Sequence, residues 1–413
     1  MVRGEGGQQR NLTVVKALTF LMFSMFAMTT DSVGIIIPEL IKSYRLSLTA
    51  AGTFQYATMT GIALAGLFLG QLADRLGRRP TILAGLTLFA TACFLFAIGE
   101  QFWFFAALMA LSGAAIGIFK TGALALIGDI VTSTAQHTSI MNTLEGFFAV
   151  GAIIGPAILT RLLAGGWSWK WLYVIAGAMC VVLIALASIV RYPVPAAATA
   201  GGGLSGTGRA IRNPYVLAFS AGAFLYVGVE AAIYVWMPTL LTDYSGSAVL
   251  LATYSISIFF LLRAAGRFLG AWVLMRVQWQ AVLALFSGGI LLCFLFSVLG
   301  GVGWAVYLLP LSGLFMSVIY PTINSKGINC LPKSDHGAAA GVILFFTCAS
   351  AVLAPLAIGA ISDAFGSIIY GFWLATAMAV LLFGVGLVNW LLNPTRAVLE
   401  QLDVSEYRRE MPA

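Results

Sequence analysis

The chain has 413 residues, of which 60% are hydrophobic and only 9% are charged, and its mean hydropathy is +0.97. A soluble domain normally has about 25% charged residues, so this composition excludes a water-soluble protein. The apolar segments are continuous rather than alternating, which excludes a transmembrane β-barrel and predicts transmembrane helices. The net charge of +7 comes from residues scattered through short loops, a pattern that argues against a nucleic-acid partner.

Twelve apolar segments follow one another along the chain, each ended by charged residues or by glycine and proline. A span needs about 20 apolar residues, and the chain has room for about 12 spans. The first six cover residues 17–40, 51–73, 80–98, 102–127, 139–163 and 171–190, and six more begin near Tyr215, Val249, Ala281, Gly303, Gly337 and Ile368. The sequence thus predicts an all-α membrane protein.

A polar segment rich in Gly, Ala and Ser separates the two sets of six spans. We therefore divide the chain into a cytoplasmic leader (1–16), a first six-helix bundle (17–190), a cytoplasmic linker (191–213), a second six-helix bundle (214–393) and a cytoplasmic tail (394–413). Two six-span halves joined by a flexible linker are typical of secondary transporters with pseudo-symmetric halves.

The positions of Lys and Arg predict the orientation. Of the 22 basic residues, only Lys42, Arg45, Arg161 and Lys170 fall in loops on the side opposite the termini, and Lys120 and Arg263 fall within spans. The positive-inside rule therefore predicts that both termini are cytoplasmic, and we expect a bacterial inner membrane. Trp167, Trp169 and Trp171, in an outer loop, are expected to form part of an interfacial aromatic belt.

The loop between the second and third spans, residues 70–80, reads GQLADRLGRRP. This loop resembles the signature loop of the major facilitator superfamily. The resemblance implies two six-helix bundles that move about one central site. It also implies a conformational latch at the cytoplasmic face, formed by Asp74, Arg75, Gly77, Arg78 and Arg79.

Three further segments carry weaker resemblances. In the second half, Gly266, Arg267 and Gly270 occupy the corresponding loop, but Leu274 stands where an acid is expected, so the second latch is degraded. The residues 151–156, GAIIGP, resemble part of the superfamily's antiporter motif, although such glycines also serve close helix packing. Segments 142–152, 226–230 and 321–324 resemble the fucose and glucose permease-like branch, which the chain departs from at Lys120 and Glu145.

Five ionisable residues lie well inside predicted spans: Asp31, Lys120, Glu145, Glu230 and Arg263. A charge near the bilayer centre costs at least about 2.5 kcal/mol, so each is a candidate functional residue unless it forms a structural ion pair. Lys120 and Glu145 both lie roughly 9 to 14 Å from the cytoplasmic end of their spans, which allows a pair. Arg263 and Glu230 differ in depth by roughly 6 Å, which a long arginine can cover.

Asp31 lies near the middle of the first span, and the counterpart span carries Glu230 at a similar depth. A carboxyl group that changes protonation with access can carry a proton, so we predict proton coupling through Asp31, with Glu230 as the second candidate. Aromatic and amide side chains on nearby spans suit a small polar solute, although each also suits core packing. The substrate-site candidates among them are Tyr226, Tyr234, Trp236, Tyr320 and Asn324.

Three functions remain open from the sequence. The first is a proton-coupled carrier for a sugar, a sugar acid or an organic anion, in which Lys120 and Arg263 receive an anionic group. The second is a multidrug or metabolite efflux antiporter. The third, an enzyme or a channel, is disfavoured because no catalytic motif, metal-ligand cluster or filter-like repeat occurs. We expect no cofactor besides the proton gradient, and a monomer whose partners are a small-molecule substrate and lipid.

Overall fold

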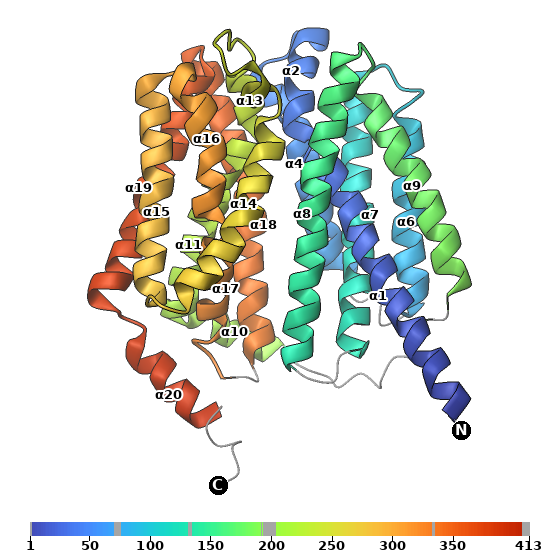
Figure 1. The fold of residues 1–413 in the computed structure, drawn as a ribbon, viewed down its shortest axis with the longest axis vertical. Coiled ribbons are helices and arrows are strands. Elements are labelled where there is room, and N and C mark those ends of the chain that lie inside the picture. Colours follow the sequence, from blue (N-terminus) through green and yellow to red (C-terminus); the bar gives the residue numbers. More distant parts are fainter. Residues whose placement is uncertain are drawn as a thin grey trace. The chain divides into compact units, whose positions relative to one another are not determined.

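The structure is a computed structural model that describes residues 2–69, 76–130, 134–190, 192, 204–332 and 335–406. These residues are helical apart from short connections, and none of them forms a strand. The chain divides into two compact units, Met1–Ala198 and Thr199–Ala413, so that the boundary falls within the segment predicted as a linker. Figure 1 shows each unit as a bundle of long helices.

Unit 1 contains the helices before the linker. Their bounds are α1 Val2–Thr30, α2 Val33–Tyr44, α3 Leu48–Ala51, α4 Thr53–Leu69, α6 Arg78–Leu95, α7 Phe102–Ile130, α8 Thr134–Ala164 and α9 Lys170–Ile189. Continuous apolar sequence favours helices because a helix satisfies its backbone N–H and C=O groups internally in lipid. Helix α1 begins at Val2, within the predicted leader, and the apolar segment long enough to span a membrane begins at Asn11.

Unit 2 contains the remaining helices. Their bounds are α10 Leu204–Arg212, α11 Pro214–Ala231, the π-helix η1 Ala232–Trp236, α12 Met237–Leu240, α13 Val249–Thr253, α14 Ser255–Leu274, α15 Trp279–Gly300, α16 Val302–Met316, α17 Ile319–Ile328, α18 His336–Phe365, α19 Ile368–Leu392 and α20 Arg396–Glu406. Helix α10 forms the end of the segment predicted as a flexible linker, and α20 lies within the predicted tail.

Ten helical segments of the described chain are long and apolar enough to cross a membrane, four in unit 1 and six in unit 2. The two other predicted spans correspond to α4 and α6. Helix α4 has 17 residues and ends beside residues outside the described ranges, and α6 has 18 residues, the first two of which are arginines. The all-α membrane fold is confirmed, and the arrangement is consistent with twelve spans.

The helices pack in the same order in both units. In unit 1, α4 and α6 both contact α7, and α1 contacts α8; in unit 2, α14 and α15 both contact α16, and α11 contacts α18. Glycine permits the closest approaches, because a Cβ atom on Gly113 or Gly313 would collide with the carbonyl oxygen of Thr58 or Phe259. The two units are therefore structural repeats built on matching close contacts.

The aromatic residues of the outer loop do not all lie at an interface. Trp167 and Trp171 are exposed and pack against each other edge to face. Trp169 is 6% exposed and contacts the rings of Phe54 and Phe105. The predicted aromatic belt is therefore wrong for Trp169, which belongs to the core of unit 1 because the start of α9 turns this ring inward.

Candidate functional site

Asp31 lies where the first span is interrupted. Helix α1 ends at Thr30 and α2 begins at Val33, and the Ile35 N–H donates to Ser32 O (3.1 Å), one residue short of the α-helical pattern. The side chain of Asp31 is half-buried and accepts a hydrogen bond from Thr30 Oγ1 (3.1 Å). A break in a spanning helix frees backbone polar groups for a ligand, so it places this carboxyl group at a functional position.

Glu230 and Arg263 form an ion pair inside unit 2. Glu230 is the penultimate residue of α11, directly before η1, and Arg263 lies on α14. Their side chains are 10% and 19% exposed, respectively. The prediction that these two residues meet is confirmed. Because each charge is neutralised by the other, this pair lowers the cost of keeping both residues in a spanning bundle.

Tyr226 connects this pair to a second helix interruption. It lies one turn before Glu230, interacts with that carboxylate, and donates from its hydroxyl to Met316 O (3.1 Å). Met316 ends α16, and α17 begins only at Ile319, so the tenth span is also broken. The rings of Tyr226 and Tyr320 stack, with centroids 6.0 Å apart. The structure thus brings together Tyr226, Glu230, Arg263 and Tyr320.

The other predicted lining residues lie in different surroundings. Trp236 is fully buried, and its indole N–H donates to Pro355 O (3.1 Å), which ties η1 to α18. Tyr234 and Asn324 are half-buried, on η1 and α17. Trp236 therefore serves packing in this structure, because a solute reaches its ring only if the helices move.

Lys120 and Glu145 lie on neighbouring helices, α7 and α8. Lys120 is half-buried, and its Nζ atom lies 5.7 Å from the ring centroid of Phe148, one helical turn after Glu145. Glu145 is exposed. Within the described part of unit 1, Lys120 makes this cation–π contact with Phe148 and forms no ion pair.

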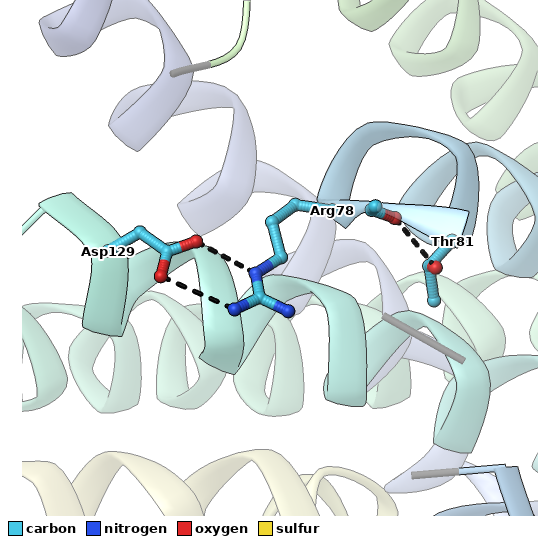
Figure 2. A network of polar contacts seen from close by, with 4 residues as sticks. Arg78, Thr81 and Asp129 are labelled. Carbon is cyan, nitrogen blue, oxygen red and sulfur yellow. Dashed lines mark hydrogen bonds and ion pairs between the residues drawn. The ribbon is translucent and has the colours of Figure 1, made fainter. Parts of the chain in front are cut away.

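Two of the residues predicted as a latch, Asp74 and Arg75, lie outside the described residues. Gly77 has φ of +91°, a conformation that favours glycine, and it turns the chain into α6. Arg78 then donates from Nε to Asp129 Oδ2 (2.8 Å) and from Nη2 to Asp129 Oδ1 (3.3 Å), as Figure 2 shows. Arg79 donates to Ser188 O. The start of α6 is thereby attached to the ends of α7 and α9.

Residues that sequence reasoning missed include Asp129, Gln55 and the pair Arg209–Asp335. Asp129 receives Arg78, and a search for the acid nearest to the end of the fourth span would have found it. Gln55 on α4 is fully buried, and neither its Nε2 nor its Oε1 atom has a hydrogen-bond partner within the described structure. Its signal in the sequence was an amide within an apolar span.

Arg209 of α10 forms two hydrogen bonds with Asp335, which precedes α18. Nε lies 2.8 Å from Oδ2, and Nη2 lies 2.6 Å from Oδ1. The hydrogen bond from Arg209 lowers the pKa of the Asp335 carboxyl group below its usual value. This contact fastens α10 to the start of α18 within unit 2.

The comparisons with known proteins agree with this architecture. The chain is 24% identical over 381 residues to a glucose/galactose transporter of Brucella abortus, with 88% of this chain and 91% of that protein covered. It is 23% identical over 402 residues to the L-fucose-proton symporter of Escherichia coli, with 88% and 90% covered. The crystal structure of the transporter FucP in its outward conformation superposes with a TM-score of 0.63 at 21% identity, covering 90% of this chain and 97% of that one.

The family is given by a sequence profile rather than by these distant relatives. The profile described as "Major Facilitator Superfamily" matches residues 19–355. This range includes the interrupted first span, the loop before α6, the Glu230–Arg263 pair and the interrupted tenth span. The chain is therefore a multi-pass membrane transporter, not an enzyme, and it belongs to the major facilitator superfamily.

Proposed function

We propose that the protein is a proton-coupled secondary active transporter of a small polar or anionic solute, in the class of sugars, sugar acids and organic anions. It works by alternating access, as a monomer in a bacterial inner membrane with both termini in the cytoplasm, and it needs no cofactor besides the proton gradient. The similarity to sugar carriers supports a hydroxylated solute. The observation that carries the proposal is the half-buried Asp31 carboxyl group at the interruption of the first span.

A carboxyl group at a helix break can bind and release a proton as access to it changes. Helix α1 ends directly before Asp31, so nearby backbone groups are available to a solute. The Thr30 hydroxyl donates a hydrogen bond to the Asp31 carboxylate. Coupling follows if the protonated and ionised forms favour different facing states of the transporter. Glu230 is the second candidate for the proton, although it forms an ion pair with Arg263.

The test is Asp31→Asn, which mimics the protonated carboxyl group. We expect this variant to lose accumulation driven by a proton gradient in proteoliposomes and to keep exchange of labelled for unlabelled solute. Exchange needs only reorientation of the loaded transporter. Asp243→Asn is the matched control, because Asp243 is exposed after the end of α12. Loss of both activities by Asp31→Asn contradicts proton coupling through Asp31, and retention of both places the proton elsewhere.

Efflux by proton antiport is the second candidate, and the resemblance of residues 151–156 to part of the superfamily's antiporter motif favours it. A Cβ atom on Gly151 or Gly155 would collide with the carbonyl oxygen of Ser24 or Met28, so these glycines let the two helices touch just before the break at Asp31. The direction of the gradient separates the two functions. A symporter accumulates solute in vesicles that are acidic outside, whereas an antiporter accumulates it in vesicles that are acidic inside.

A further inference from the structure

Lys120 is a basic residue in the fourth span whose charge is not balanced by a carboxylate in the described part of its own unit. It lies within the candidate span Phe102–Ile127, and its side chain is half-buried. Its recorded contact is with the Phe148 ring, 5.7 Å from Nζ to the centroid. An aromatic face attracts a cation but carries no net charge, and the ammonium group has three hydrogen-bond donors to satisfy.

The corresponding position in unit 2 shows whether helix packing needs a positive charge here. Residues 111–113 and 311–313 both read Leu-Ser-Gly, so positions 200 apart correspond and Lys120 corresponds to Tyr320. Tyr320 stacks on Tyr226 and packs its helix without a charge. Packing at this point of the repeat therefore does not require a cation.

Arg263, the other basic residue that was predicted to lie well inside a span, is already matched. Arg263 pairs with Glu230 inside unit 2, so that pair contributes no net charge. Of these two residues, Lys120 is the one whose charge a ligand can neutralise. A single carboxylate balances it, whereas a dianion such as a phosphate ester would leave surplus negative charge within the membrane.

We propose that the transported solute is a hydroxylated monocarboxylate and that Lys120 binds its carboxylate. This inference rests on the proposed function, because it names the solute that moves with the proton. One carboxylate and one proton cross together, so each cycle transfers no net charge. Transport of a neutral sugar with one proton would instead move one positive charge.

The experiment compares D-galacturonate with D-galactose, which differ only at C6, in proteoliposomes with the full-length protein. A pH gradient and a potassium diffusion potential set with valinomycin are imposed separately. We expect the pH gradient to drive accumulation of D-galacturonate and the electrical potential to leave it unchanged. The same design applies to the pairs D-glucuronate and D-glucose, and trihydroxybenzoate and trihydroxybenzene.

Lys120→Met removes the charge at similar side-chain length. We expect it to weaken binding of the acid about 100-fold, as loss of one partner of a desolvated charge pair does, and to change binding of the neutral analogue little. Lys120→Arg should retain part of the affinity. Lys170→Met is the matched control, because Lys170 also lies over a phenylalanine ring, 4.9 Å from Phe105, at the start of α9. Thermal unfolding of each variant checks its folding.

Three outcomes would overturn the proposal. If only neutral solutes accumulate and the electrical potential drives them, the solute is a neutral sugar and proton-coupled transport still stands. If the acid accumulates equally well in wild type and Lys120→Met, Lys120 is not its receptor. If a pH gradient drives accumulation of no compound in any pair, both this proposal and the proposed function are wrong.

Discussion

The two units use one helical plan but place their charged side chains differently. The repeat is visible at a constant spacing of 200 residues: Pro38 and Pro238 correspond, as do the Leu-Ser-Gly segments, and so do residues 66–70 and 266–270, which share Gly, Phe, Leu and Gly at the same places. Yet none of the five ionisable residues predicted to lie well inside spans has a charged residue at the corresponding position of the other unit. Asp31 corresponds to Ala231, Lys120 to Tyr320 and Glu145 to Phe345, while Glu230 corresponds to Thr30 and Arg263 to Ala63.

This difference assigns distinct roles to the units. In unit 2 the two charges neutralise each other, and Tyr226 attaches them to the break between α16 and α17. In unit 1 Asp31 and Lys120 are half-buried and Glu145 is exposed, so these side chains are less enclosed by their own unit than Glu230 is. A matched pair is suited to holding a bundle together, and less enclosed charges are suited to binding and releasing ions. We infer that unit 2 supplies the fixed charges and unit 1 the exchangeable ones.

The largest expected effect comes from breaking the matched pair of unit 2. Arg263→Ala or Glu230→Ala leaves an uncompensated charge in the bundle, so each should lower stability by about 3–5 kcal/mol. The double variant should recover most of this loss, because it leaves no isolated charge. Thermal unfolding of the purified proteins in detergent measures the stability losses of the two single variants and the double variant.

Unit 1 provides the contrasting measurement. Lys120→Met should not lower the unfolding temperature, because the variant removes a charge that has no matching carboxylate in its described surroundings. A loss for Lys120→Met as large as that for Arg263→Ala would remove the distinction between the units. The distinction would also be removed if the stability losses of the two single variants added up in the Arg263 and Glu230 double variant.

A smaller effect is expected at the start of α6, beside the predicted latch loop of unit 1. Asp129→Asn weakens a two-point contact with Arg78 whose side chains are 11% and 13% exposed (Figure 2). Hydrogen bonds to charged groups typically contribute about 1.5–3 kcal/mol, so stability should fall by less than for the pair in unit 2.

Asp74→Asn, in the predicted latch, should slow transport more than it weakens solute binding, because it shifts the balance of facing states.

The control for this loop is its counterpart in unit 2, where Gln278 occupies the position that corresponds to Arg78. Gln278→Ala should leave transport rates and solute affinity unchanged, because the degraded second loop lacks the acid of the first. If Asp74→Asn transports at the wild-type rate, the loop is only a topological signal. Equal effects of the two substitutions would also contradict an asymmetric latch.

The sequence predicted the features that depend on depth in the membrane. Continuous apolar segments gave the spans, and the heights of Glu230 and Arg263 predicted their ion pair, which the structure contains. Depth does not determine which way a side chain points around its helix. For that reason the same argument placed Lys120 beside Glu145, whereas its recorded contact is one turn further along α8, with Phe148.

Other features of the site depend on tertiary packing and were not predictable from composition. The interruptions at Asp31 and after Met316 lie in segments that read as uninterrupted apolar spans. Gln55 stands out in the sequence as an amide within an apolar span, but its full burial depends on the close packing of α4 on α7. Internal comparison at a spacing of 200 residues would have identified the asymmetry of the charges before the structure did.

The smallest expected effect concerns the pair Arg209–Asp335, whose arginine is more exposed than that of the Arg78–Asp129 contact in unit 1. The exposed fraction is 60% for the Arg209 side chain and 8% for Asp335. The hydrogen bond from Arg209 lowers the pKa of Asp335, so this carboxyl group binds a proton less readily in the folded protein than in the unfolded chain. Its stabilising contribution is therefore fully present above the unfolded pKa of about 3.9 and is lost as the pH falls through the lower folded value.

Thermal unfolding of wild type and Asp335→Asn between pH 3 and pH 7 tests this contact. The wild type should be more stable by a small, constant margin from pH 5 to pH 7, and the margin should shrink below about pH 4 as Asp335 becomes protonated. Arg209→Gln should show the same dependence, because it removes the other half of the contact. A margin that persists undiminished at the lowest pH would show that Asp335 stabilises the start of α18 by packing alone. In that case the exposed pair of unit 2 would be no electrostatic counterpart to the better buried Arg78–Asp129 contact of unit 1.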